Sequence, residues 1–369
     1  MRLRPVLISA LLAAGAIPAA AQDREPVAPV RHGISIGNYP SVSGLRFNFR
    51  DQDLQQVRGA NFTIWSPYGE PTGTVRGLAF GAPLTGAGSI HGIATGLFGV
   101  GASQELTGIA IAPVGIGAGG RMKGIMAGGV GVGSGGDLQG FAFGGVGAGV
   151  GGNARGILIG GIGAGVGGNL RGGAAGLIGV GAGGNVDGIT VGGIGAGAGG
   201  RLNGIAVGGI GVGVGGNVRG ALIGGIGAGA GGSLRGVGIG GIGVGVGGDL
   251  RGIALSLVGI GAGGTIDGIA IAGVGIGAPT IRKFAMASMV GAKRMDGLII
   301  APVLSRLEED GSMRGVSVSA VNAMRGQQHG LTIGIVNYAR ELDGMQIGVI
   351  NIARNASVKF LPIVNYHKK

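Results

Sequence analysis

The sequence contains no cysteine, and only 4% of its 369 residues are aromatic. The absence of cysteine excludes disulfide bonds and thiolate metal sites, so stability has to come from packing and backbone hydrogen bonds. No aromatic residue occurs between Gly144 and Lys283. Binding of single-stranded nucleic acid relies on aromatic stacking, and outer-membrane barrels carry aromatic girdles, so both are disfavoured over this stretch.

Charged residues are also few, at 12%, and the basic ones are in excess, which gives a formal net charge of +12. A basic balance favours anionic partners such as an acidic polymer of the cell envelope. The simpler interpretation is a solvated basic surface that keeps the chain soluble. The partner itself, which could equally be another surface protein, is not identified by charge, and specific nucleic-acid binding is not expected.

The first 21 residues have the pattern of a secretory signal peptide. Arg2 and Arg4 precede the apolar run VLISALLAAGAI, and small residues stand before Gln22, where we expect cleavage. The run is too short for a transmembrane helix, and no cysteine follows the cleavage site to carry a lipid. We therefore expect export to the periplasm, the outer-membrane surface or the extracellular medium.

Glycine is abundant, with 95 residues, and it is periodic. From Gly92 to Gly268 a glycine recurs every sixteen residues and opens twelve units that resemble GIxVGGIGxGxGGNLR. The chain accordingly divides into five segments after the pattern of its repeats. They are a signal peptide (1–21), irregular N-terminal repeats forming a cap (22–91), strict repeats (92–279), an irregular insert (280–314) and C-terminal repeats with periodic asparagine (315–369).

The repeat predicts strands and not helices. The unit from Gly204 contains seven glycines, and each costs about 1 kcal/mol in a helix relative to alanine. Short alternations of Val, Ile, Leu and Ala are bounded by Gly-Gly and Gly-Asn, which is typical of short strands and tight turns.

The fold predicted from these units is an all-β, parallel β-helix-like β-solenoid with one rung for about 16 residues. The apolar positions change parity at Gly208-Gly209, whereas a strand that crosses an outer membrane keeps one apolar face over about 9–11 residues. An outer-membrane β-barrel is the alternative. In the unit from Gly204 we expect glycines at the corners and Arg219 in solvent. The side chains expected to point inward are those of Ile205, Val207, Ile210, Val212, Val214 and Val218.

No catalytic, cofactor-binding or metal-binding residue is predicted. The pattern G-x-G-x-x-G at Gly163 recurs in later rungs, whereas a dinucleotide fingerprint occurs once, between a strand and a helix. Calcium-binding β-rolls need an aspartate in GGxGxD, and Gly133 occupies that place. The four histidines are far apart in sequence, so we do not expect an enzyme.

Two candidate binding surfaces follow from the sequence. The residue before each repeated glycine is often basic, and Arg155, Arg171, Arg219, Arg235 and Arg251 could form a strip for an anionic partner. The simpler interpretation is a charged corner that keeps the rod soluble and discourages edge pairing. Trp65 and Tyr68 could form a ligand patch, although the N-terminal aromatics could simply plug the first rungs.

The C-terminal repeats place an asparagine at regular intervals, and we expect a turn ladder whose amides hydrogen-bond from rung to rung. These residues are Asn322, Asn337, Asn351 and Asn365.

The last 55 residues resemble the bacterial surface repeat-containing proteins, whose units read like GxQIGxxNxA and often end in LPxxN. The matching residues are Gly330, Ile333, Gly334, Asn337, Gly344, Gln346, Ile347, Gly348, Asn351, Leu361, Pro362 and Asn365. The resemblance implies an exported repeat protein of a Gram-negative envelope and carries over no catalytic residue. We therefore expect a non-enzymatic structural or adhesin-like element. The alternatives are an integral outer-membrane barrel, or a glycan-binding or glycan-cleaving solenoid with its site near Trp65 or in the insert.

Overall fold

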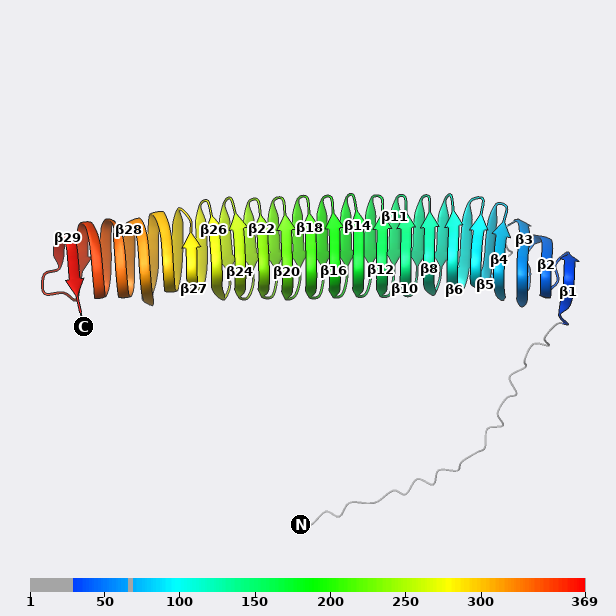
Figure 1. Ribbon diagram of the computed structural model, residues 1–369, viewed down its shortest axis with the longest axis horizontal. Coiled ribbons are helices and arrows are strands. Elements are labelled where there is room, and N and C mark those ends of the chain that lie inside the picture. The colour runs from blue at the N-terminus through cyan, green and yellow to red at the C-terminus, as the bar shows by residue number, and fades with distance from the viewer. Residues whose placement is uncertain (1–28, 66–68, 369) are drawn as a thin grey trace, which may run out of the picture.

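The computed structural model describes residues 29–65 and 69–368, so the predicted signal peptide and Tyr68 lie outside the described residues. The described chain is a long, straight coil with its two ends at opposite ends of a rod (Figure 1). Its strands pair in parallel with the next rung along the rod, as in β18, β20 and β22. The predicted β-solenoid is therefore confirmed, and the barrel alternative is wrong. The part of the chain that the structure describes has no helix long and apolar enough to cross a membrane.

The strands fall into three groups along the rod. The N-terminal rungs contain β1 (Arg31–Ile36), β2 (Ser41–Arg50), β3 (Gln56–Trp65), β4 (Thr74–Gly81), β5 (Leu84–Gly96) and β6 (Gly99–Ala112). The longer strands of the regular rungs are β8 (Arg121–Gly128), β10 (Leu138–Gly144), β12 (Ala154–Gly160), β14 (Leu170–Gly176), β16 (Val186–Gly192), β18 (Leu202–Gly208), β20 (Val218–Gly224), β22 (Leu234–Gly240), β24 (Leu250–Ser256) and β26 (Thr265–Ala272). The short strands between them are β7 (Gly115–Ala118), β9 (Gly131–Ser134), β11 (Gly147–Val150), β13 (Gly163–Val166), β15 (Gly179–Ala182), β17 (Gly195–Ala198), β19 (Gly211–Val214), β21 (Gly227–Ala230), β23 (Gly243–Val246) and β25 (Gly259–Ala262). The C-terminal rungs contain β27 (Gly275–Met286), β28 (Met289–Ala353) and β29 (Phe360–His367).

Each regular rung contributes one long and one short strand, and each kind stacks on its own kind. The long strand β20 pairs with β18 and β22, and the short strand β21 pairs with β19 and β23. Equivalent residues lie directly opposite each other, for example Gly204 and Gly220. One rung of the coil therefore takes sixteen residues, which is the period of the sequence.

The core is a thin layer between the long-strand and short-strand sheets. In one rung Val218, Leu222, Ala228 and Ala230 point inward, and each is at most 5% exposed. These side chains repeat in register through the regular rungs, where they form a continuous apolar core.

The predicted inward set is only partly correct. Val212, Val214 and Val218 are buried and Arg219 is exposed. The prediction is wrong for Ile205, Ile210 and Val207. Ile205 and Ile210 are 40% and 49% exposed, and Val207 lies on the same outer side as Ile205. Ala206 points inward instead. The buried positions keep one parity through Gly208-Gly209, without the predicted change, because Ala206 lies in register with Leu222 of the next rung and both are buried on the inner side.

The repeated glycine that opens each unit has a positive φ, for example +132° at Gly220. A Cβ added there would overlap the carbonyl oxygen of Gly204 in the preceding rung. Both the backbone angle and the close approach require glycine, which explains the strict sixteen-residue register.

The two ends of the rod differ from the prediction. Residues 280–314 were expected to be an irregular insert, but β27 and β28 continue the coil, with Gly297 opposite Lys283. Rungs of unequal length hide this continuity in the sequence. At the other end the aromatics do not plug the coil, since Phe47 stacks on Phe62 outside the core with ring centroids 4.8 Å apart.

Candidate functional site

The outer surface of the long-strand sheet carries two unbroken rows of mostly apolar residues, which we call the apolar face. The first row follows the repeated glycine and contains Ile93, Ile109, Ile125, Phe141, Ile157, Gly173, Ile189, Ile205, Ala221, Val237, Ile253 and Ile269. The second row lies two residues further along and contains Thr95, Ile111, Ala127, Phe143, Ile159, Ala175, Val191, Val207, Ile223, Ile239, Leu255 and Ile271. Neither row contains a charged residue in these twelve rungs.

The apolar face is open to solvent along the rod. Ile157 and Ile189 are 49% and 50% exposed, whereas Leu222 of the core is 1% exposed. The rows continue into the less regular ends, through Ile34 near the N-terminus and Leu298 near the C-terminus. A third apolar row turns the corner between the two sheets, and its isoleucines are about half exposed: Ile162, Ile178, Ile194, Ile210, Ile226 and Ile242.

The outer surface of the short-strand sheet has almost no side chains, because its outward positions are glycines. We call this surface the glycine strip. Gly213 and Gly245 have no positive φ, and a Cβ built on either would meet nothing within 4 Å. The fold does not require glycine at these positions, in contrast to Gly220.

The predicted arginine strip borders the apolar face. Arg219 lies on the same outer side of β20 as Ile223, separated from it by the repeated glycine and one further outward residue. All five arginines are exposed, but they form two groups, since Asp187 and Asn203 stand between them in the row. The first group contains Arg155 and Arg171, and the second contains Arg219, Arg235 and Arg251.

The first arginine group lines a polar groove of about 480 Å³ together with a row of amide side chains at the Gly-Gly-Asn corner. The backbone N–H of Asn169 donates to Oδ1 of Asn153 at 2.9 Å, and that of Asn185 donates to Oδ1 of Asn169 at 2.8 Å. Each side chain in this row therefore caps a backbone donor of the following rung. Asp137, Asp187, Arg121 and Arg201 line the same groove, and the Arg171 guanidinium lies 3.7 Å from the carboxylate of Asp187.

Aspartates take the same capping position in two rungs. The backbone N–H of Asn153 donates to Asp137 at 2.7 Å, and this bond, helped by Arg121 and Arg155, holds the pKa of Asp137 below its ordinary value of 3.8. The backbone N–H of Thr265 lowers the pKa of Asp249 in the same way.

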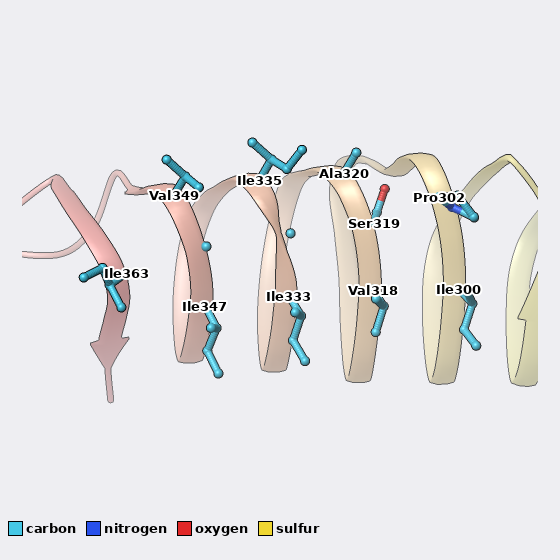
Figure 2. Close-up of a pocket in the computed structure, with 12 residues that line it drawn as sticks. Ile300, Pro302, Val318, Ser319, Ala320, Ile333, Ile335, Ile347, Val349 and Ile363 are labelled. Carbon is cyan, nitrogen blue, oxygen red and sulfur yellow. The ribbon is translucent and has the colours of Figure 1, made fainter.

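The apolar face deepens into a groove of about 650 Å³ at the C-terminal end. Figure 2 shows the two rows of side chains that line this groove on successive turns of β28. One continues the second row of the apolar face and contains Ile300, Val318, Ile333 and Ile347. The other lies two residues further along and contains Pro302, Ala320, Ile335 and Val349. Ile363 of β29 closes the end of the groove, with a φ of +69° that a β-branched residue rarely adopts.

The asparagine ladder lies inside the coil. Asn322 donates to Asn337 and Asn337 donates to Asn351, both at 2.7 Å, and all three are fully buried. Asn365 is also buried, but it lies on the antiparallel strand β29, opposite Gln346. The amides thus bridge the interiors of neighbouring rungs and do not lie at exposed turns.

The structure does not assemble the predicted aromatic patch. Trp65 is 47% exposed, and the Arg50 guanidinium lies 5.9 Å from the centre of its ring. Its predicted partner Tyr68 lies outside the described residues. Within the ranges 29–65 and 69–368, no three His, Asp or Glu side chains form a group that could hold a metal ion.

Two features were missed by sequence reasoning. One is the apolar face. The sequence pattern that indicates it is that successive residues of a long strand are apolar, although only every second side chain of a strand can point into the core. The other is a buried polar cluster in the first rungs, where Arg46 pairs with Asp51 and donates to Asn61 at 2.8 Å. Its signal is the alternation of polar and aromatic residues in LRFNF.

Comparison with family models, with curated proteins and with solved structures finds no match to this chain.

Proposed function

We propose that this chain is an exported, non-enzymatic structural or interaction element of the bacterial cell envelope, and that the apolar face is its contact surface. The observation that carries this proposal is the double row of solvent-exposed apolar side chains that runs without a charge through the twelve strict rungs. The signal-peptide pattern and the resemblance of the C-terminal repeats to surface repeat proteins support the envelope location.

The size of the face favours a contact function. With strands about 4.8 Å apart, the apolar face and the corner row together cover on the order of 1,000 Å² over the strict rungs. Soluble monomers rarely expose contiguous apolar patches larger than about 300–600 Å². These residues also do not fill the core, which is supplied by the opposite parity, so their repetition is not explained by the fold.

The test replaces apolar residues of the face with serine and follows the protein in cell fractions. The triple variant Ile157→Ser, Ile189→Ser and Ile205→Ser removes three exposed side chains of the first row. The matched control is Gly165→Ser, Gly213→Ser and Gly245→Ser in the glycine strip, where a Cβ meets nothing within 4 Å.

We expect the wild type and the glycine-strip control to sediment with the envelope and the apolar-face variant to shift to the soluble fraction, with all three melting at similar temperatures. An apolar-face variant that folds and still sediments like the wild type would contradict the proposal.

A second candidate function is binding of an acidic polysaccharide in the polar groove, which is lined by amide side chains, by four arginines and by two aspartates: Arg121, Arg155, Arg171, Arg201, Asp137 and Asp187. The double variant Arg155→Gln and Arg171→Gln should weaken binding to a polyuronate, while Arg219→Gln and Arg235→Gln, outside this groove, should have less effect. Equal binding by both variants and the wild type would exclude the groove as the binding site.

A further inference from the structure

The outward side of each long strand combines a basic or polar position with two apolar ones. In β20 these are Arg219, Ala221 and Ile223, while Val218 and Leu222 point into the core. Stacked along the rod, the apolar positions form a long band, which Arg219, Arg235 and Arg251 border in three consecutive rungs. Segments that lie in the plane of a membrane interface show this arrangement, with apolar side chains in the acyl boundary and Lys or Arg at the headgroups.

The geometry of the rod suits a flat surface. Each long strand pairs with the long strand of the next rung along the rod, as in β18, β20, β22 and β24, so their outward residues share one side of the coil (Figure 1). Every rung can then reach the same plane, and the energy of contact adds up along the rod without any rearrangement of the fold.

The charges of the arginine row, which lies beside the apolar face, favour a lipid surface over a second copy of the chain as the partner. Arg219, Arg235 and Arg251 lie in consecutive rungs beside the apolar face. Arg251 pairs with Asp249 at 3.1 Å, and the apolar rows themselves contain no acidic residue. A second copy packed on this face would bring the same three arginines, with only Asp187 and Asp267 as acids in that row over the strict rungs, whereas anionic headgroups would neutralise the arginines.

We propose that the apolar face is a membrane-contact surface, on which the rod lies along an anionic lipid bilayer with Arg219, Arg235 and Arg251 at the headgroup phosphates. This proposal rests on the proposed contact role of the apolar face and names its partner.

The experiment is flotation of the purified mature chain with vesicles of phosphatidylcholine, with or without phosphatidylglycerol. The apolar-face variant is Ile205→Ser, Ile223→Ser and Ile253→Ser, and the arginine variant is Arg219→Gln, Arg235→Gln and Arg251→Gln. The control is Gly213→Ser, Gly229→Ser and Gly245→Ser, where the nearest atoms to a Cβ are 3.8 Å away or more.

We expect the wild type and the control to float with the anionic vesicles. The apolar-face variant should lose flotation with both kinds of vesicle. The arginine variant should lose roughly fivefold in partitioning for each arginine on anionic vesicles only, and added salt should weaken the wild type more than this variant.

No flotation of the wild type, or equal flotation of the wild type and the apolar-face variant, would overturn the lipid proposal. The lipid proposal would also fail if light scattering showed a dimeric wild type and a monomeric apolar-face variant, and neither protein floated. The partner would then be a second copy of the chain. If envelope sedimentation still depends on the apolar face when flotation fails, only the lipid proposal is lost and the proposed function stands.

Discussion

Glycine has two different roles at the residue scale. At Gly220 a positive φ and the carbonyl oxygen of Gly204 leave no room for a side chain. At Gly213 the backbone is ordinary and the Cβ position is open. The same residue type is therefore a requirement of the coil at one position and a property of the surface at the other.

We expect Gly220→Ala to lower the free energy of unfolding by about 3 kcal/mol or more, because the Cβ forces two rungs apart and the φ is unfavourable. Gly213→Ala should leave stability unchanged or raise it by about 0.4–1 kcal/mol, since alanine restricts only the unfolded chain. Denaturant unfolding of both variants measures the difference. Equal destabilisation would show that the two glycines are not distinguished in this way.

The corner aspartates give stability a defined pH dependence. Because the pKa values of Asp137 and Asp249 are lowered below 3.8 in the fold, their contribution is fully present above the unfolded pKa and is lost as the pH falls through the folded one. In the double variant Asp137→Asn and Asp249→Asn the amide oxygens keep accepting the same backbone bonds, as Asn153 does.

We therefore expect the melting temperature of this double variant to fall less than that of the wild type between pH 6 and pH 2, with a small difference between the two proteins at pH 6. Melting curves across this range provide the measurement. Parallel curves for the two proteins would mean that these carboxylates do not contribute to the acid dependence.

At the scale of the rung, a hydrogen-bonded ladder of side chains contributes more to stability inside the coil than at its exposed corner. Asn337 is fully buried and joins Asn322 to Asn351 through hydrogen bonds. Asn217 accepts a backbone bond from Ser233 at 2.8 Å, but it lies exposed at the corner. Loss of a buried partner leaves polar groups without water to replace it.

We expect Asn337→Ala to cost about 2–4 kcal/mol of unfolding free energy, from two unpaired buried amides and the space left behind. Asn217→Ala should cost about 1 kcal/mol or less, because water can reach the freed N–H. Denaturant unfolding compares the two, and a larger effect at Asn217 would contradict the assignment of the interior ladder.

The rung was predictable from the sequence, and the direction of its side chains was not. Strict glycine spacing and the apolar alternation predict strands, turns and a coil of the observed circumference. Alternation alone does not say whether Ile205 or Ala206 faces the core, because both are apolar. Side-chain size does not decide it either, because the inward position holds Ala206 in one rung and Leu222 in the next.

The ends of the rod were less predictable for similar reasons. The inward position of Arg46 depends on its pairing with Asp51, which the turn after β2 brings close. Lys283 replaces the repeated glycine with a φ of +78° and forms an ion pair with Asp267 at 2.7 Å. The sequence signal for a regular rung is lost at this position although the coil continues.

At the scale of the whole molecule the rod has surfaces of different character along its entire length. About twenty strand spacings of roughly 4.8 Å separate Gly33 from Gly344, which gives a length of roughly 95 Å. The Gly-Gly-Asn corner and the arginine row are polar, while the apolar face and the corner isoleucines are not. The apolar rows repeat through the strict rungs, whereas the charges beside them differ from rung to rung.

The central claim is that the two apolar rows that follow the repeated glycine face outward, while residues of the opposite parity on the same long strands fill the core. Because the chain contains no cysteine, a single introduced thiol reports on one position. The decisive measurement is the rate of thiol labelling in the folded protein for Ile223→Cys and for Leu222→Cys, side chains that are 36% and 1% exposed in the native chain.

We predict labelling of Cys at the first position at a rate close to that of a free thiol, and protection at the second position until the protein is unfolded. Protection of position 223 together with rapid labelling of position 222 would show that the inward and outward sides are the reverse of those described, and would contradict the proposed contact surface.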